Sequence, residues 1–199
     1  MSALFRFGRN LLAVLMWLCH RVEFEGTENI PSCGGFIICS NHRTDMDPVY
    51  LAWKIPRQLY FMAKIELFRI PVLGFLMRKL EAFPVERGKG DTGAIEYAIN
   101  IVQSGKILAM FPEGTRSKDG KLLRGKSGIA VIASKSGGDV LPVGLKFTEP
   151  VCFRSKITVR FGKIIPNSEL NIEDNKTSDI KAATTRIMID IAALMEDNA

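Results

Sequence analysis

A chain of 199 residues, 47% of them hydrophobic, can bury one sizeable core and fits a single domain better than two. Its net charge of +6 favours an acidic partner, such as phosphate groups, anionic lipid or nucleic acid, without choosing among them. The four cysteines form no CxxC pair, which argues against a disulfide framework or a zinc site and favours a reducing cytoplasm.

The N-terminal segment, residues 1–21, predicts a helix that lies on a membrane. Its uninterrupted apolar run, Leu11 to Cys19, is about half of the roughly 20 residues needed to span a bilayer. A signal peptide is not favoured, because a small-residue cleavage site is missing. Bulky apolar side chains flanked by Arg6, Arg9 and Arg21 suit a helix in the headgroup region. The alternative is a first helix packed on the core.

Residues 22–199 alternate between strand-like and helix-like stretches. Short apolar or β-branched runs predict strands at residues 22–25, 36–40, 60–63, 82–85, 107–111, 140–145 and 157–161. Helical patterns are expected at residues 49–54, from 91 or 92 to 102, 127–136 and 178–194, with loops at 31–35 and 166–177. This alternation predicts an α/β fold: a single domain with a central mixed sheet flanked by helices, preceded by the amphipathic N-terminal membrane-associating helix.

The segment CSNHRTDMDPVY places a histidine and two acids at the end of an expected strand, a common position for a site in an α/β fold. On a continuous helix His42 and Asp47 would point about 140° apart, so a turn must separate them, and Thr44 and Asp45 favour one. A carboxylate on one ring nitrogen leaves the other nitrogen available as a base. No serine accompanies the pair, so the nucleophile must be the substrate's own hydroxyl. Spacing alone leaves Asp45 as a rival for Asp47.

No metal site is expected. The other histidine, His20, is far along the chain from His42, and the sequence has no clustered set of histidines and carboxylates.

A second polar segment, FPEGTRSKDGKLLRGK, follows another expected strand. Gly114 permits close backbone approach, and Arg116 offers the planar fork that matches phosphate. Further positive charge comes from Lys118, Lys121, Arg124 and Lys126. A basic surface loop would not need the tight Pro-Glu-Gly-Thr turn, so this segment favours a site for a polar headgroup.

Together, NHRTDMD and FPEGTRS resemble the first and third motifs of the glycerolipid acyltransferase family that makes phosphatidic acid from 1-acylglycerol 3-phosphate. The stretch EAFPVERG, ending at Arg87, resembles the second motif, although Ala82 stands where a glycine is common. The stretch VLPVGLK, with Pro142, resembles the fourth. The resemblance runs from His42 to about Lys146, half the chain.

The resemblance implies that His42 and Asp47 are the catalytic pair, and it selects Asp47 over Asp45. The substrate-binding residues that we expect are Lys64 of AKIELF, Arg87, Glu113, Gly114, Thr115, Arg116 and Lys126. The implied reaction moves a fatty acyl group from acyl-CoA or acyl carrier protein to the free sn-2 hydroxyl of 1-acylglycerol 3-phosphate, giving phosphatidic acid in phospholipid biosynthesis. It needs no metal or redox cofactor.

Several alternatives are kept. The acceptor of such a transferase can also be glycerol 3-phosphate or another lysolipid, since each fits a phosphate clamp. A thioesterase would use water and would not need the arginines. A non-catalytic module that binds lipid or nucleic acid would leave the histidine–aspartate pair without a purpose, and the aromatic residues typical of single-strand binders are sparse, so nucleic acid is not expected. The expected location is the cytoplasmic face of a membrane, held peripherally or monotopically on an anionic surface.

Overall fold

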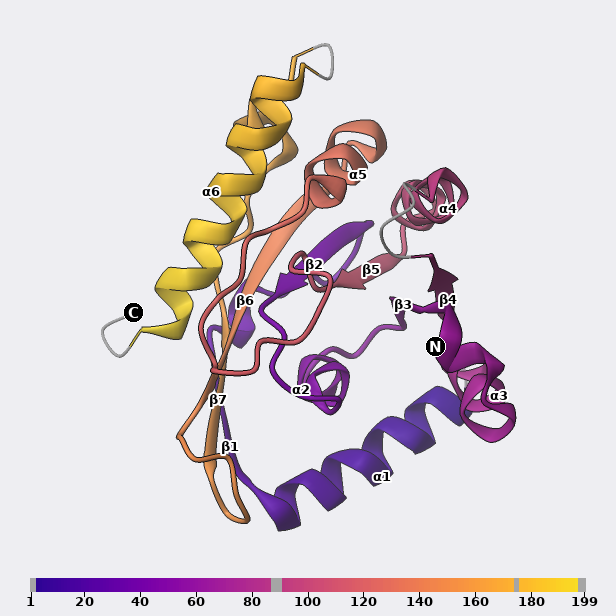
Figure 1. Ribbon diagram of the computed structural model, residues 1–199, viewed down its shortest axis with the longest axis vertical. Coiled ribbons are helices and arrows are strands. Elements are labelled where there is room, and N and C mark those ends of the chain that lie inside the picture. Colours follow the sequence, from indigo (N-terminus) through magenta and orange to yellow (C-terminus); the bar gives the residue numbers. More distant parts are fainter. Residues whose placement is uncertain (1–2, 87–90, 174–175, 197–199) are drawn as a thin grey trace.

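The computed structural model describes residues 3–86, 91–173 and 176–196, which fold around one seven-stranded sheet (Figure 1). The strands lie in the order β1-β7-β6-β2-β5-β3-β4, and all neighbours are parallel except β6 and β7. Their bounds are β1 (Arg21–Glu25), β2 (Phe36–Ser40), β3 (Leu59–Lys64), β4 (Ala82–Val85), β5 (Ile107–Met110), β6 (Asp139–Phe147) and β7 (Lys156–Phe161). The predicted α/β domain with a central mixed sheet is confirmed, and each predicted strand lies within two residues of an observed one.

Six α-helices and three short 3-10 helices connect and cover the strands in the described part of the chain. They are α1 (Ala3–Cys19), α2 (Asp47–Trp53), α3 (Pro71–Lys79), α4 (Thr92–Gln103), α5 (Gly128–Ser136) and α6 (Thr177–Met195), with η1 (Thr27–Asn29), η2 (Ile65–Arg69) and η3 (Asn167–Leu170). Helix α3 is missing from the sequence-based expectations, and η3 lies in a stretch expected to be a loop. The short helices η1 and η2 were not predicted either, and the other five α-helices match the expected ranges closely.

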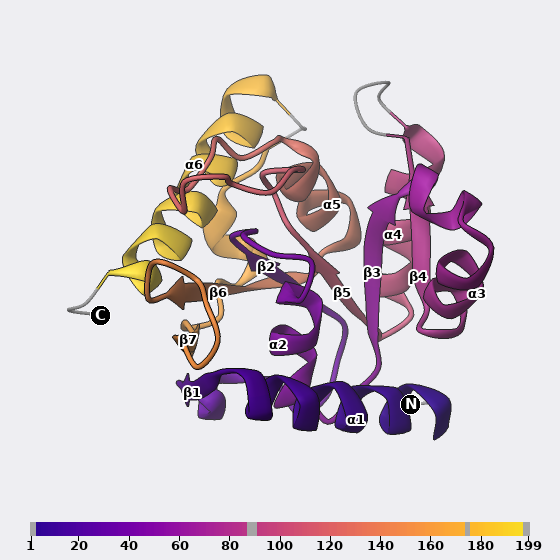
Figure 2. The same cartoon turned by 60° about the horizontal axis from the view of Figure 1, so that its bottom comes forward.

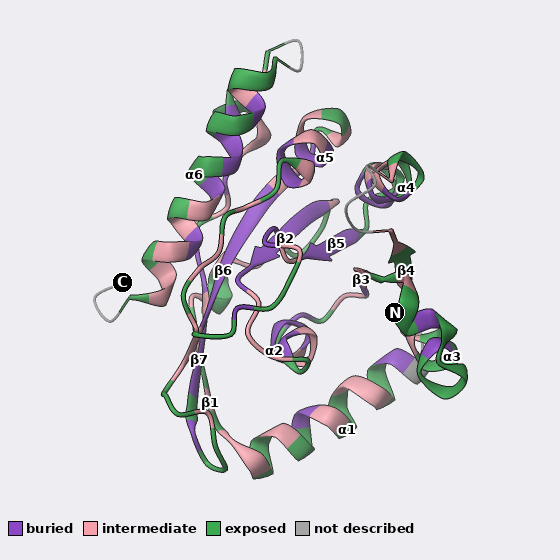
Figure 3. Cartoon of the chain, viewed as in Figure 1, coloured by how far each residue is buried: buried purple, intermediate pink, exposed green. Residues whose placement is uncertain are grey.

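The two faces of the sheet bury two separate apolar clusters, and β2 contributes to both. Successive strand residues point to opposite faces, so Ile37 and Cys39 pack with α4, α5 and α6, while Phe36 and Ile38 pack with α1 and α2. Figure 3 shows the central strands buried along their length. Because β2 is covered on both faces, the residues that follow it are anchored to a rigid part of the fold.

Helix α1 packs one face on the domain and exposes the other. Phe5 and Ala13 are buried, and Arg9 Nη1 donates to the Ile55 carbonyl oxygen at 2.7 Å. The opposite face exposes large apolar side chains at Phe7, Leu11, Val14, Trp17 and Leu18. Figure 2 shows α1 lying across the domain below α2. One face of α1 is therefore packed on the core, as in the alternative interpretation of this segment. Core packing does not explain the apolar side chains on the outer face. Within the described residues, we find no helix with enough length and apolar character to cross a membrane.

Candidate active site

The carboxyl ends of four parallel strands meet at one edge of the sheet, and the predicted site residues follow them. His42 comes two residues after β2, Glu113 three residues after β5, and Lys64 ends β3. Such an edge is where open α/β sheets bind ligands. Arg87, two residues beyond β4, falls outside the described residues.

His42 and Asp47 form the predicted dyad. His42 Nδ1 lies 2.7 Å from Asp47 Oδ2, and the Asp47 side chain is fully buried while the His42 ring reaches the surface. The two residues meet because the chain turns between them before α2 begins at Asp47. An ionised Asp47 carboxylate accepts a hydrogen bond from the Nδ1–H group of His42, and this tautomer leaves Nε2 as the basic nitrogen. Asp45, the rival from spacing, is exposed and does not contact the ring.

The Asp47 carboxylate is held by the loop that carries His42. Its Oδ2 also accepts hydrogen bonds from the backbone N–H groups of Arg43 at 2.6 Å and Thr44 at 2.9 Å, and its Oδ1 accepts from the Thr44 hydroxyl at 2.7 Å. A buried carboxylate is costly unless it is hydrogen-bonded, and here both oxygens are occupied. The loop therefore fixes the dyad before substrate binds.

Two residues outside the predicted site restrain His42: Phe111 contacts its ring, and Asn41 anchors the chain directly before it. The Phe111 ring stacks on the His42 ring, with centroids 4.0 Å apart and planes 13° apart. Asn41 is buried, and its side-chain amide exchanges two hydrogen bonds with the backbone of Leu145, donating at 2.8 Å and accepting at 2.7 Å. Asn41 is the first residue of the NHRTDMD motif and Phe111 the first of the FPEGTRS motif, but neither was predicted to be a site residue.

Glu113 joins the two motifs from beneath the surface. Only 3% of it is exposed; Oε1 accepts from the His42 backbone N–H at 2.7 Å, and Oε2 accepts from the Leu123 backbone N–H at 2.8 Å. Burial raises the pKa of Glu113 above its ordinary value, while the two amide donors act in the opposite direction. The carboxylate that was expected to meet the acceptor is thus engaged with the backbone.

Gly114 and Lys126 lie against each other at the surface beside Glu113. Gly114 has a φ of +68°, and a Cβ built on it would lie 2.8 Å from Lys126 Nζ. The Lys126 backbone N–H donates to the Pro112 carbonyl oxygen at 2.9 Å, which joins the two ends of the connection between β5 and α5. Lys126 also lines a groove of about 1040 Å³ between this loop and α6. The glycine thus leaves room for the lysine side chain.

Arg116 and Lys64 each have an acidic partner at the surface. Arg116 pairs with Asp45, and Lys64 Nζ lies 3.3 Å from Glu66 Oε1; all four side chains are largely exposed. Thr115 is exposed beside Arg116. Exposed ion pairs contribute about 0–1 kcal/mol, so a phosphate can displace the carboxylates at little cost. The structure brings Arg116 close to the dyad loop through Asp45.

The fold and the dyad together define an acyltransferase-type domain, and a family model described as Acyltransferase matches residues 21–146. The 1-acyl-sn-glycerol-3-phosphate acyltransferase of Streptococcus pneumoniae is 31% identical, over 97% of this chain and 74% of that protein. The protein of the same name from Bacillus subtilis is 36% identical, over 64% of this chain and 65% of its own.

A solved structure agrees with these sequence matches. The crystal structure of the 1-acyl-sn-glycerophosphate (LPA) acyltransferase PlsC from Thermotoga maritima matches with a TM-score of 0.71 and 26% identity, covering 98% of this chain and 79% of that one. The chain belongs to the PlsC, or 1-acyl-sn-glycerol-3-phosphate acyltransferase, family.

Proposed function

We propose that this protein transfers a fatty acyl group from a thioester, acyl-CoA or acyl-acyl carrier protein, to the sn-2 hydroxyl of 1-acyl-sn-glycerol 3-phosphate, giving phosphatidic acid. The observation that carries the proposal is the His42–Asp47 dyad, 2.7 Å across, whose outer nitrogen faces away from the carboxylate and is free to take a proton from a hydroxyl. The relatives named above carry this activity in their names.

The nucleophile in this mechanism is the acceptor's hydroxyl. Cys39 is the cysteine nearest to His42 in sequence, but it is fully buried in the cluster beneath α4 and α5, and burial raises the pKa of its thiol far above the ordinary value. A neutral, buried thiol is a poor nucleophile. An acyl-enzyme intermediate on this residue is therefore disfavoured.

In the proposed reaction, His42 Nε2 removes the proton of the acceptor hydroxyl as its oxygen attacks the thioester carbonyl carbon. Asp47 stabilises the imidazolium that forms. The tetrahedral intermediate collapses, the carbon–sulfur bond breaks, and the imidazolium returns its proton to the thiolate. A general base of this kind contributes about 10² to 10⁴ to the rate.

The acceptor's phosphate is proposed to bind among Arg116, Lys64, Lys126 and Arg87. The first three lie at the same edge of the sheet as His42, and Arg116 contacts the dyad loop through Asp45. A guanidinium binds phosphate through two parallel hydrogen bonds, so Arg116 is suited to fix the orientation of the acceptor. We assign Glu113 to position His42, because both of its oxygens accept backbone hydrogen bonds.

We further propose that the protein works at the cytoplasmic face of a membrane. The apolar outer face of α1 supports this location, and so do the four unpaired cysteines, which suit a reducing compartment. The acyl chain of the acceptor then stays in the bilayer while its headgroup reaches His42.

A substrate panel tests the proposal. Radiolabelled acyl-CoA and acyl-acyl carrier protein are each combined with 1-acylglycerol 3-phosphate, glycerol 3-phosphate or a lysolipid without an exposed phosphate monoester, and the products are separated by thin-layer chromatography. We expect phosphatidic acid from the first acceptor. Labelled free fatty acid that forms equally without any acceptor would instead indicate a thioesterase, and no product from any pair would indicate a binding module.

A further inference from the structure

Helix α3 and the 3-10 helix η2 before it expose an apolar surface that the proposed chemistry does not use. We name this surface the α3 apolar face; its residues are Leu67, Ile70, Val72, Leu73, Phe75 and Leu76. Val72 is 81% exposed, more than any other large hydrophobic side chain in the described residues, and Phe75 is 61% exposed. Soluble monomers rarely leave so many neighbouring apolar side chains in water.

These side chains point outward because α3 packs on η2 through a glycine and not through its large apolar side chains. Gly74 is the buried residue of the helix, and a Cβ there would lie 2.3 Å from the Phe68 carbonyl oxygen, so the helix presses on η2 at this point. Val72, Phe75 and Leu76 follow the helical spacing of three and four residues on another face. Residues 71–77 of α3 are all apolar, so the exposed side of this part of the helix needs an apolar environment of its own.

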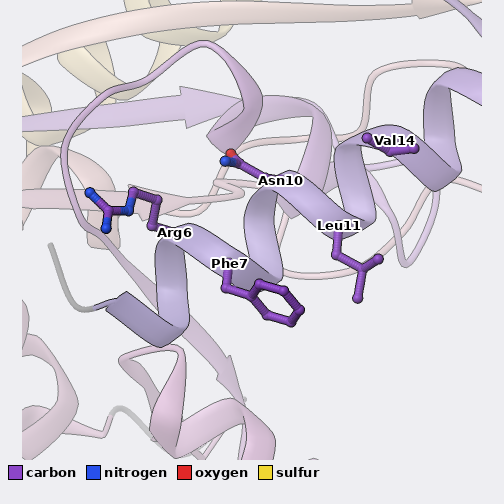
Figure 4. A pocket seen from close by; sticks show the side chains of 5 residues that line it. All are labelled: Arg6, Phe7, Asn10, Leu11 and Val14. Carbon is purple, nitrogen blue, oxygen red and sulfur yellow. The ribbon is translucent and has the colours of Figure 1, made fainter.

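The start of α1 lies beside α3, as Figures 1 and 2 both show. A Cβ built on Gly8 of α1 would lie 3.7 Å from the side chain of Leu80, the residue after α3. Figure 4 shows Phe7 and Leu11 projecting from the same side of α1. The two helices thus offer neighbouring apolar faces, although they come from different parts of the chain.

Both segments are rich in basic residues, and two of these residues lie beside aromatic side chains of η2 and α3. Residues 3–19 and 64–81 together contain six arginines and lysines against two glutamates, Glu66 and Glu81. On α3, Lys79 Nζ lies 5.6 Å from the Phe75 ring centre, and the Arg78 guanidinium lies 5.6 Å from the Phe68 ring centre. Long basic side chains that lie along apolar surface with an outward charge are suited to lipid headgroups.

We propose that the α3 apolar face is a second membrane-docking surface, which inserts into the acyl region of an anionic bilayer beside α1. The occupant is the bilayer, because the apolar centre and the basic border complement the two layers of an anionic lipid surface. The proposal rests on the membrane location proposed above and adds a second docking surface to the outer face of α1.

Docking through this surface has a consequence for the acceptor. Lys64 ends β3 and is followed directly by η2 at Ile65, so insertion of η2 and α3 brings Lys64 to the level of the headgroups. The phosphate of a membrane-held acceptor then meets Lys64 while its acyl chain remains in the bilayer. Loss of the α3 apolar face should therefore raise the KM for long-chain acceptors and leave turnover of a short-chain, soluble acceptor nearly unchanged.

Vesicle sedimentation with the full chain tests the proposal. Val72→Ser with Phe75→Ser should weaken binding to vesicles of phosphatidylglycerol and phosphatidylcholine by a factor of about ten, from the apolar area no longer buried. The matched control is Ile189→Ser, which removes an exposed side chain on α6 and should leave binding unchanged. Arg78→Gln with Lys79→Gln should weaken binding to these vesicles but not to vesicles of phosphatidylcholine alone.

Three outcomes would overturn the proposal: unchanged vesicle binding by the Val72 and Phe75 variant, an equal loss with Ile189→Ser, or a lipid-free dimer of the wild type that this variant dissociates in sedimentation velocity. The last result would make a second copy of the chain the occupant. Circular dichroism and turnover of the soluble acceptor verify that each variant is folded. Vesicle binding is measured without substrate, so its failure is distinct from a failure of the proposed acyl transfer.

Discussion

The Glu113 carboxylate accepts a hydrogen bond from the backbone N–H of His42 at 2.7 Å. This bond joins the loop after β5 to the loop after β2, although the two residues are 71 positions apart in the sequence. The second carboxylate oxygen accepts from Leu123. Glu113 thereby joins His42 to the loop that carries the basic residues. A substitution at Glu113 removes or weakens a hydrogen bond to the backbone of His42 or of Leu123.

We expect Glu113→Gln to destabilise the fold and to change its pH dependence. An amide offers only one acceptor oxygen, so one buried backbone N–H loses its partner, at a cost of about 1–3 kcal/mol. The pKa of Glu113 is raised in the folded state, so between its ordinary value near 4.5 and the raised value the folded chain binds more protons than the unfolded chain. Stability contributed by this group therefore falls as pH rises through that window.

Urea denaturation of both proteins across a pH series measures this effect. The free energy of unfolding of the wild type minus that of Glu113→Gln should decrease as pH rises above 4.5 and then level off. An increase over the same range would mean that the folded-state pKa is lowered, contrary to the burial of the side chain.

His42→Ala should lower turnover by a factor of about 10² or more, because the base is removed. Although only 13% of the His42 side chain is exposed, its backbone N–H bond to Glu113 is kept in the variant, so the fold and lysophosphatidate binding should remain. Single-turnover kinetics measures the loss of turnover, and calorimetric titration measures the binding of lysophosphatidate. A variant that kept more than about a tenth of the wild-type rate would contradict the general-base role.

Asp47→Asn should lose a factor of about 10² to 10⁴ in kcat with the fold intact. The amide oxygen can replace Oδ2 toward His42, Arg43 and Thr44, and the amide nitrogen can donate to the Thr44 hydroxyl, but the charge that stabilises the imidazolium is gone. The matched control is Asp45→Asn, which removes an exposed acid that does not contact the ring. Comparable kcat losses in the two variants would argue against Asp47 as the orienting residue.

Arg116→Ala should raise the KM for the phosphorylated acceptor more than the KM for the acyl donor. The guanidinium is half exposed and its partner in the described part of the chain is the exposed Asp45, so its removal should change stability little. Arg116→Lys keeps the charge without the planar fork and should recover only part of the affinity. Steady-state kinetics with a phosphate-free acceptor analogue provides the comparison: an equal loss there would give Arg116 a structural role.

Local patterns in the sequence predicted the strands and a pair formed by His42 and a nearby aspartate, and the resemblance to the family selected Asp47 over Asp45. The strands are short apolar runs, and His42 and Asp47 meet through a turn of five residues, so no long-range contact had to be foreseen. Helix α3 was missed for a physical reason: residues 71–77 are apolar without interruption although most of them are exposed, so no alternation of apolar and polar residues marks a surface helix.

The role of Glu113 was not predictable in the same way. A glutamate in a basic loop suggests contact with a substrate, and its burial depends on how the loop at residues 122–126 folds back over it. Phe111 beside His42 likewise depends on the pairing of β5 with β2. Pairing of distant strands leaves no local signature, so these contacts appear only in the folded chain.

The last prediction separates the two faces of α1. Phe7, Leu11 and Val14 lie on the outer face and are exposed, whereas Phe5 is 4% exposed in the cluster beneath the sheet. Replacing the three outer residues with serine should change the free energy of unfolding little, about 0.5 kcal/mol or less per site, and should weaken sedimentation with anionic vesicles.

Phe5→Ala should do the reverse, lowering the free energy of unfolding by up to about 3–5 kcal/mol, because it leaves a cavity under α1. The variants are therefore more informative than deletion of the whole helix, which would uncover α2 and confound membrane binding with unfolding. Activity on long-chain acceptors should fall with the outer-face variant, and activity on short-chain acceptors should persist. If the folded outer-face variant still sedimented with vesicles as well as the wild type, the outer face of α1 would not hold the membrane, and docking would have to depend on another surface.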